Sequence, residues 1–199
     1  MVEGSTYSIN GVNTKFDLVQ FYVSNIRMVD ASGNETPATG EYLLVLPEEE
    51  MYTTGSLPPG DYIKLRFDIG IDSATNHADP STYNLGDPLG PQFPNMHWGW
   101  DFGYIFLRID GMVDKDLNGS TETPFEIHLG KDEFLTAVEI DYPFNTEAGS
   151  TYDAHITINW TELFEGVDMT GELTTHTGDN MTLATQIANN LEVIFSKEE

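Results

Sequence analysis

Apolar and polar residues alternate with a period of two along much of this chain. Within residues 61–71, Ile63, Leu65, Phe67 and Ile69 alternate with charged or polar residues. This period places the apolar side chains together on the inward face of a β-strand. The same pattern, together with enrichment in β-branched and aromatic residues, predicts further strands at 15–29, 41–46, 104–109, 125–129, 134–142 and 152–160.

Only the last segment follows the period of a helix. Leu183, Ile187, Leu191 and Ile194 are spaced so that they form a single apolar stripe, and either Asp179 or Asn180 can serve as the N-cap. Many short strands and one terminal helix predict an all-β protein, an antiparallel β-sandwich of immunoglobulin-like or jelly-roll type with a short C-terminal helix. Because no repeat or linker divides the sequence, we expect one domain over residues 1–199.

A long polar connection, residues 72–97, leads into an aromatic cluster before the strand at 104–109. Loops longer than about 15 residues without secondary structure are uncommon in compact domains and often have a function. This one ends with two metal donors, Met96 and His97, followed by Trp98 and Trp100. Two interpretations stay open: the tryptophans fill one end of the sandwich, or the cluster forms part of a metal site.

The charge and composition of the chain indicate which kinds of molecule it can bind. Eight basic and 33 acidic residues give a net charge of −25, which repels nucleic acids and anionic membranes and attracts cations. The absence of cysteine excludes disulfides and thiolate metal sites. No apolar run approaches the about 20 residues of a membrane span, and no signal peptide precedes the polar start, so we expect any export signal to lie outside this sequence.

One acidic turn has the spacing of a calcium loop. Asp114, Asp116 and Asn118 supply side-chain oxygens at positions 1, 3 and 5, Gly119 follows, and Glu122 stands at position 9. Position 12 lacks the bidentate glutamate of an EF-hand, and no helices flank the turn. The segment is therefore either a plain acidic turn or a weak structural calcium site.

Histidines supply the remaining candidate chemistry. His97 and His128 lie on the polar side of predicted strands, and His176 precedes the C-terminal helix. A site of two or three histidines without thiolate suits copper or zinc, although a histidine taken alone is more often an ordinary surface or core residue than a ligand. Because the sequence contains no nucleophile elbow, P-loop, dinucleotide fingerprint or zinc-protease motif, we expect a protein that is not an enzyme.

The stretch from Met96 to Gly111 resembles the signature of the methanobactin-associated copper-binding (MbnP-like) proteins of bacteria. It has the pattern Met-x-Trp-x-Trp-x-x-Gly-Tyr-x-Phe, followed by an acidic residue and glycine. Three further stretches are similar to the family in the same order, at 76–81, 127–130 and 175–178. The resemblance thus extends over most of the chain.

This resemblance implies a β-sandwich protein that is secreted, periplasmic or anchored to the outer membrane by a lipid. It also implies, for some members, copper held by two histidines and a tryptophan oxidised to kynurenine by a dihaem, peroxidase-type partner enzyme. By motif position, the ligands here would be among His97, His128 and His176, and the converted residue would be Trp98 or Trp100. The alternative is a structural or interaction module with a calcium-stabilised loop and no transition metal.

Overall fold

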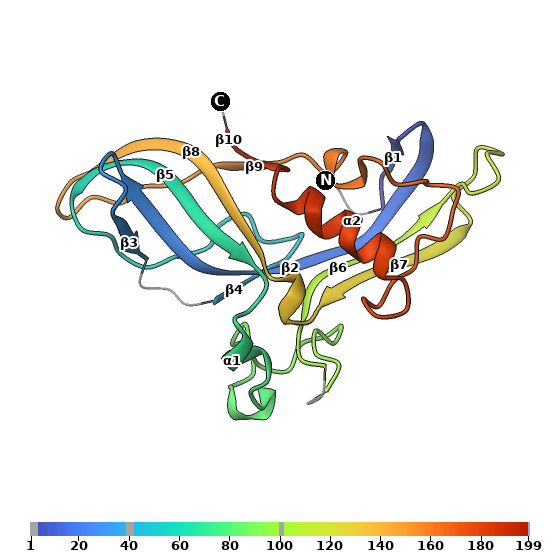
Figure 1. Ribbon diagram of the computed structural model, residues 1–199, viewed down its shortest axis with the longest axis horizontal. Coiled ribbons are helices and arrows are strands. Elements are labelled where there is room, and N and C mark those ends of the chain that lie inside the picture. Colours follow the sequence, from blue (N-terminus) through green and yellow to red (C-terminus); the bar gives the residue numbers. More distant parts are fainter. Residues whose placement is uncertain (1–3, 39–41, 100–101, 199) are drawn as a thin grey trace.

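The computed structural model describes residues 4–38, 42–99 and 102–198, and one large antiparallel sheet dominates it (Figure 1). The long strand β2 lies at its centre, in the order β7-β6-β2-β5-β8, and three short strands also pair with β2. Bulges along β2 bend the sheet, one of them between Ser24 and Arg27, where Asn25 has a positive φ. The eight strands are β1 (Thr6–Ile9), β2 (Val12–Asp30), β3 (Glu35–Pro37), β4 (Tyr42–Val45), β5 (Gly60–Ile69), β6 (Ile105–Val113), β7 (Thr123–Gly130) and β8 (Thr136–Thr146).

A second layer covers one face of this sheet. It contains the helix α2 (Met181–Leu191), the short turn η3 (Glu162–Phe164) and the two-stranded sheet of β9 (Ile156–Ile158) and β10 (Phe195–Lys197). Figure 1 shows α2, β9 and β10 on the same side of the large sheet. The apolar stripe of α2 and the inward residues of the strands form the main hydrophobic core between the two layers.

A smaller core lies on the opposite face of the sheet. There the connection after β5 carries α1 (Ser73–Asn76) and η1 (Pro80–Thr82), and its loops form the projection below the sheet in Figure 1. Met96 and Tyr104 are buried in this smaller core together with Tyr22 of β2. The connection is therefore packed against the sheet.

The sequence patterns predicted most of these elements. The all-β sandwich and the terminal helix are confirmed, and Asn180 is the N-cap, because its side chain accepts a hydrogen bond from the Leu183 amide. The inward orientation predicted for Ile63 is wrong, since a register shift between Tyr62 and Lys64 leaves Ile63 exposed and buries Tyr62 instead. The strand predicted at 152–160 is shorter than expected, and only its centre pairs with β10.

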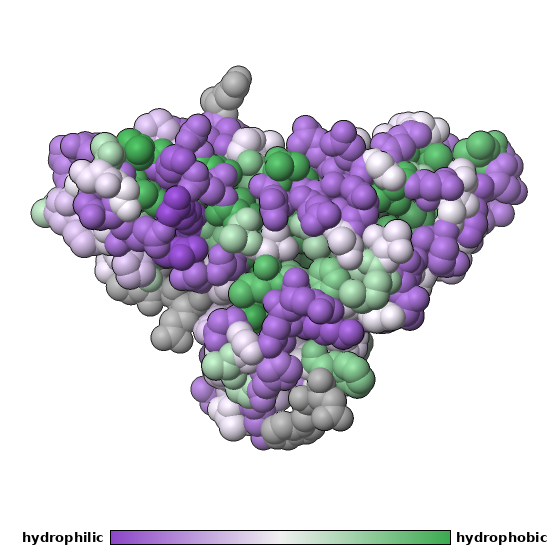
Figure 2. Space-filling model, viewed as in Figure 1, coloured by the Kyte–Doolittle hydropathy of each residue, from purple (hydrophilic) through white to green (hydrophobic). Residues whose placement is uncertain are grey.

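Hydrophilic residues cover most of the face seen in Figure 2, with hydrophobic residues in separate patches. This surface agrees with the strongly acidic composition. Of the helices that the structure describes, none is long and apolar enough to cross a membrane.

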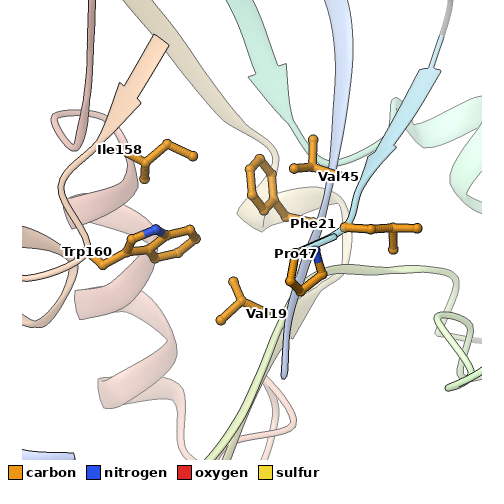
Figure 3. Close-up of a pocket in the computed structure, with 7 residues that line it drawn as sticks. Val19, Phe21, Val45, Pro47, Ile158 and Trp160 are labelled. Carbon is orange, nitrogen blue, oxygen red and sulfur yellow. The ribbon is translucent and has the colours of Figure 1, made fainter. Parts of the chain in front are cut away.

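A small apolar pocket of about 100 Å³ lies between the sheet and the β9 layer (Figure 3). Phe21 and Trp160 face each other across it, with ring centroids 6.1 Å apart and the planes at 67°. Its lining residues are apolar: Val19, Phe21, Val45, Leu46, Pro47, Ile158 and Trp160. Because none of them ionises or ligates metals, this pocket reflects the packing of the two layers.

Candidate metal centre

Three side chains with metal-ligand chemistry converge on the large sheet. Glu126 and His128 come from β7, and His176 comes from the segment before α2. One ligand atom of each residue lies within 4.8 Å of those of the other two. The rings of the two histidines meet edge to face, with centroids 4.9 Å apart. Among the described residues, this is the group of histidines and acids with the spacing of a metal site.

The strand β7 positions two of these ligands by its alternation. Phe125, Ile127 and Leu129 point into the main core, so Glu126 and His128 point to the other face of the sheet. That face also carries the smaller core and the projecting loops. The imidazole of His128 is almost completely buried, whereas the carboxylate of Glu126 is half exposed.

The segment around His176 is attached to the edge of β7 like a short parallel strand. The Thr175 amide donates to the Glu126 carbonyl at 2.8 Å, and the His128 amide donates to the Thr175 carbonyl at 2.8 Å. The buried Thr177 hydroxyl donates to the His128 carbonyl at 3.0 Å. These bonds on both sides of His176 hold the backbone of this segment beside β7, which places His176 next to His128 although the two residues are distant in the sequence.

A partly buried carboxylate orients His128. Its Nε2 lies 2.7 Å from Oδ1 of Asp110 on the neighbouring strand β6, and the Arg108 guanidinium donates to Oδ2 of the same carboxylate, with Nε at 2.8 Å and Nη2 at 2.7 Å. Burial opposes ionisation of Asp110, but the hydrogen bonds from His128 and Arg108 outweigh it and lower the pKa of this carboxyl. The charged carboxylate holds the proton on Nε2 of His128, which leaves the lone pair on Nδ1 for a metal.

His176 has an equivalent outer partner. Its Nδ1 lies 2.9 Å from Oδ2 of Asp179, and its backbone amide donates to Oδ1 of the same residue at 2.6 Å. Slight burial opposes ionisation of Asp179, but these two hydrogen bonds outweigh it and lower the pKa of the carboxyl. Nε2 of His176 then faces Oε2 of Glu126 at 3.2 Å.

This arrangement fits a transition-metal ion. Ligating histidines commonly donate their second ring N–H to a carboxylate, as both histidines do here. In a tetrahedral site with metal–ligand bonds of about 2.0–2.1 Å, the ligand atoms lie about 3.3 Å from one another. The ligand atoms of Glu126, His128 and His176 lie up to 4.8 Å apart, so they must move closer together to bind an ion. Glu126 and His176 have side chains 50% and 41% exposed, so they have room to close onto the fixed His128.

The third predicted ligand, His97, lies outside this group. It pairs with Tyr104 as an isolated β-bridge, and its ring meets the Tyr104 ring edge-on at 4.6 Å. Its Nδ1 accepts a hydrogen bond from the Gly99 amide at 2.9 Å, and its buried Nε2 has no hydrogen-bond partner within the described part of the chain. Burial lowers the pKa of His97, so the ring is neutral at pH 7.

Of the two candidate tryptophans, Trp98 lies beside the metal-ligand face. A Cβ atom added to Gly130 would come within 2.5 Å of the Trp98 ring, so the indole packs directly against this glycine. Gly130 is two residues beyond His128 in β7 and therefore on the same face of the sheet. Trp100 lies outside the described residues.

The predicted calcium loop is held together by its own hydrogen bonds. The buried Asp114 accepts the amides of Asn118 and Gly119, both at 2.9 Å, and the Asn118 side chain donates to Asp116 at 3.0 Å. These bonds close the turn without a cation. Calcium binding here stays a prediction, and Glu122 is exposed at the end of the loop.

The sequence patterns did not identify Glu126, Asp110 or Asp179 as parts of the site. Local signals for two of them exist, because Glu126 shares the polar face of its strand with His128, and Asp179 follows His176 by three residues. Asp110 is found only from the pairing of β6 with β7.

Comparisons with known proteins agree with this fold. None of the curated proteins matches this chain. The solved structure described as MbnP from Methylosinus trichosporium is similar, with a TM-score of 0.62 and 16% sequence identity over 94% of this chain and 81% of that one. The MbnP family model matches residues 1–183, most of the sequence, so the chain belongs to the MbnP family.

Proposed function

We propose that this protein is a non-enzymatic copper-binding protein of the bacterial cell envelope, with the metal held by His128, His176 and Glu126. The observation that carries the proposal is the convergence of these three ligand atoms within 4.8 Å, with a carboxylate behind each imidazole. Membership of the methanobactin-associated MbnP family supports copper as the metal.

The donor set is compatible with this choice. Imidazole and carboxylate ligands bind Cu(II) more tightly than the other divalent first-row metals, and without thiolates the site resembles neither a structural zinc nor an iron–sulfur centre. The net charge of −25 raises the concentration of cations near the surface. His128 is buried, whereas the side chains of His176 and Glu126 are 41% and 50% exposed, so an ion from the solvent can reach these two ligands.

We further propose that Trp98 is the residue that a dihaem, peroxidase-type partner converts to kynurenine. An intact indole offers only an N–H donor, whereas the amine and ketone of kynurenine have lone pairs for a metal. The packing of Trp98 on Gly130, beside His128, favours Trp98 for this role. We also propose that the protein is exported to the periplasm or attached to the outer membrane through a lipid, as the family resemblance implies.

The test uses protein isolated from its native host, analysed for metal and intact mass. The proposal expects about one copper per chain, and fragmentation should place a gain of one oxygen atom and a loss of one carbon atom at Trp98. Protein made without the partner enzyme should still bind added copper through His128 and His176. Native protein without copper, together with equal copper affinity in the wild type and a His128→Ala/His176→Ala variant, would refute the assignment.

A further inference from the structure

A second pocket, of about 370 Å³, is lined mainly by residues of the connection between β5 and β6. Figure 1 shows that the loops of this connection project from the sheet on the side away from α2. This volume lies at the lower end of the range for small-ligand sites. Apolar and aromatic residues form much of its wall, among them Pro80, Pro91, Met96, Trp98 and Tyr104. His128, His176 and Glu126 do not line it, and Trp98, the proposed kynurenine, is the one residue that it shares with the metal centre.

The polar groups of this pocket present oxygen atoms. The amide nitrogen of Gln92 donates to three backbone carbonyls, at 2.8, 3.2 and 3.2 Å, and that of Asn95 donates to the His97 carbonyl at 2.6 Å. With both NH₂ groups engaged, the acceptor oxygens of the two amides have no donor within the described part of the chain. The pocket therefore offers acceptors to a ligand that brings its own donors.

The electrostatic environment is negative. Residues 67–107 contain no lysine or arginine. Arg108, the next cation along the chain, donates through Nη1 to the Asn95 carbonyl at 3.2 Å, and its charge is balanced by the ion pair with Asp110. The Asp79 carboxylate lies close enough to act electrostatically on the rings of His97 and Tyr104, which border the pocket. His97 is itself neutral, because burial lowers its pKa.

We propose that this pocket binds a guanidinium group, the arginine side chain of a partner protein. Guanidinium presents five donors in a plane, which matches the two amide oxygens and the nearby carboxylate, and it stacks on aromatic faces such as that of the partly exposed Trp98. Phe93, directly after the lining residue Gln92 in the sequence, is fully exposed. Its ring is therefore available for contact with the protein that carries the arginine.

The first experiment titrates the unmodified chain with N-acetyl-arginine amide, followed by nuclear magnetic resonance. The matched probe is N-acetyl-citrulline amide, which has nearly the same shape and no charge. We expect arginine to shift the amide signals of Gln92, Asn95 and the Trp98 indole and to bind at least about tenfold more tightly than citrulline. Equal binding of the two probes, or no shift at these residues, would overturn the proposal.

The second experiment replaces the charge beside the pocket. Asp79 caps η1 by accepting the Ser81 amide at 2.9 Å, and Asp79→Asn keeps this acceptor while it removes the charge. Arginine binding should weaken about fivefold in Asp79→Asn and stay unchanged in the control Glu192→Gln, which removes a charge after α2. Equal loss in both variants would indicate only the general field of the acidic protein and would refute the site.

A third comparison distinguishes a partner protein from a free ligand. A peptide with arginine between two leucines should bind more tightly than N-acetyl-arginine amide, and Phe93→Ser should remove that gain without changing the affinity for the single residue. A peptide that binds no better would exclude the protein partner. These titrations use the unmodified chain without copper, so their outcome does not depend on whether His128 and His176 bind a metal.

Discussion

Replacement of Asp110 by asparagine tests how the sheet prepares His128 for a metal. In the wild type one carboxylate accepts from His128 at 2.7 Å through Oδ1 and from Arg108 through Oδ2. Asparagine has one acceptor oxygen, so its NH₂ group must face either the imidazole N–H or the guanidinium, which are both donors. We therefore expect His128 to lose its anionic partner and its fixed orientation.

The expected loss of copper affinity can be taken from other proteins in which a carboxylate accepts a hydrogen bond from a ligating histidine. Their removal typically lowers metal affinity about 10- to 100-fold, which corresponds to about 1.4–2.8 kcal/mol. We expect Asp110→Asn to reach this range, because Asp110 is largely buried and contacts the most buried ligand. Asp179→Asn removes the same charge at the other histidine, but that carboxylate is 55% exposed, so its loss should be less than about fivefold.

The assay is a competitive titration of Cu(II) against a chelator of known affinity, with thermal unfolding measured on the same samples. Asp179→Asn controls for the change in charge near the metal. Equal affinities for Asp110→Asn and the wild type, while His128→Ala loses binding, would show that the carboxylate does not orient the ligand. Equal losses of copper affinity in Asp110→Asn and Asp179→Asn would show that Asp110 acts only through its charge.

Three further predictions concern ligand coupling, backbone strain and acid stability. His128→Ala and His176→Ala should each abolish most copper affinity, and a double-mutant cycle by the same titration should be strongly non-additive, whereas additive small losses would contradict a shared metal. Gly103→Ala should lower the free energy of unfolding by several kcal/mol in urea titrations, because φ of Gly103 is +74° and the added Cβ would lie 2.3 Å from the side-chain oxygen of the buried Asn76. The control Gly33→Ala, where φ is +84° and the space around the added Cβ is open, should lower it by only about 1–3 kcal/mol. Because the pKa of Asp110 is lower in the folded state, this carboxylate stabilises the fold above the ordinary aspartate pKa of about 3.9, and the stabilisation is lost as pH falls through the folded value. The free energy of unfolding of Asp110→Asn should therefore depend less on pH below about 4 than that of the wild type. The same pH dependence in both proteins would refute this.

Period-two alternation was enough to predict the strands that face the main core. It failed where the backbone departs from regular pairing, as at Ile63, since a bulge shifts the faces by one residue and leaves no local signature in side-chain type. The β1–β2 hairpin was also missed, although Asn10-Gly11 is a typical two-residue turn and both residues have positive φ.

The candidate site was predicted only in part. His128 and His176 come together because Thr175 pairs with the edge of β7, a contact between residues far apart in the sequence that alternation does not encode. No pattern in the sequence separates His97 from these two, because all three histidines are beside polar positions. His97 lies against Tyr104, away from the other two histidines, and this position is determined by the tertiary structure.

Pulsed electron paramagnetic resonance of the Cu(II)-loaded protein counts the imidazoles bound to the metal and so tests the central claim most directly. The account predicts two imidazoles in the wild type and in His97→Ala, and one in each of His128→Ala and His176→Ala. Two imidazoles in His128→Ala, or the loss of one in His97→Ala, would contradict the proposed centre.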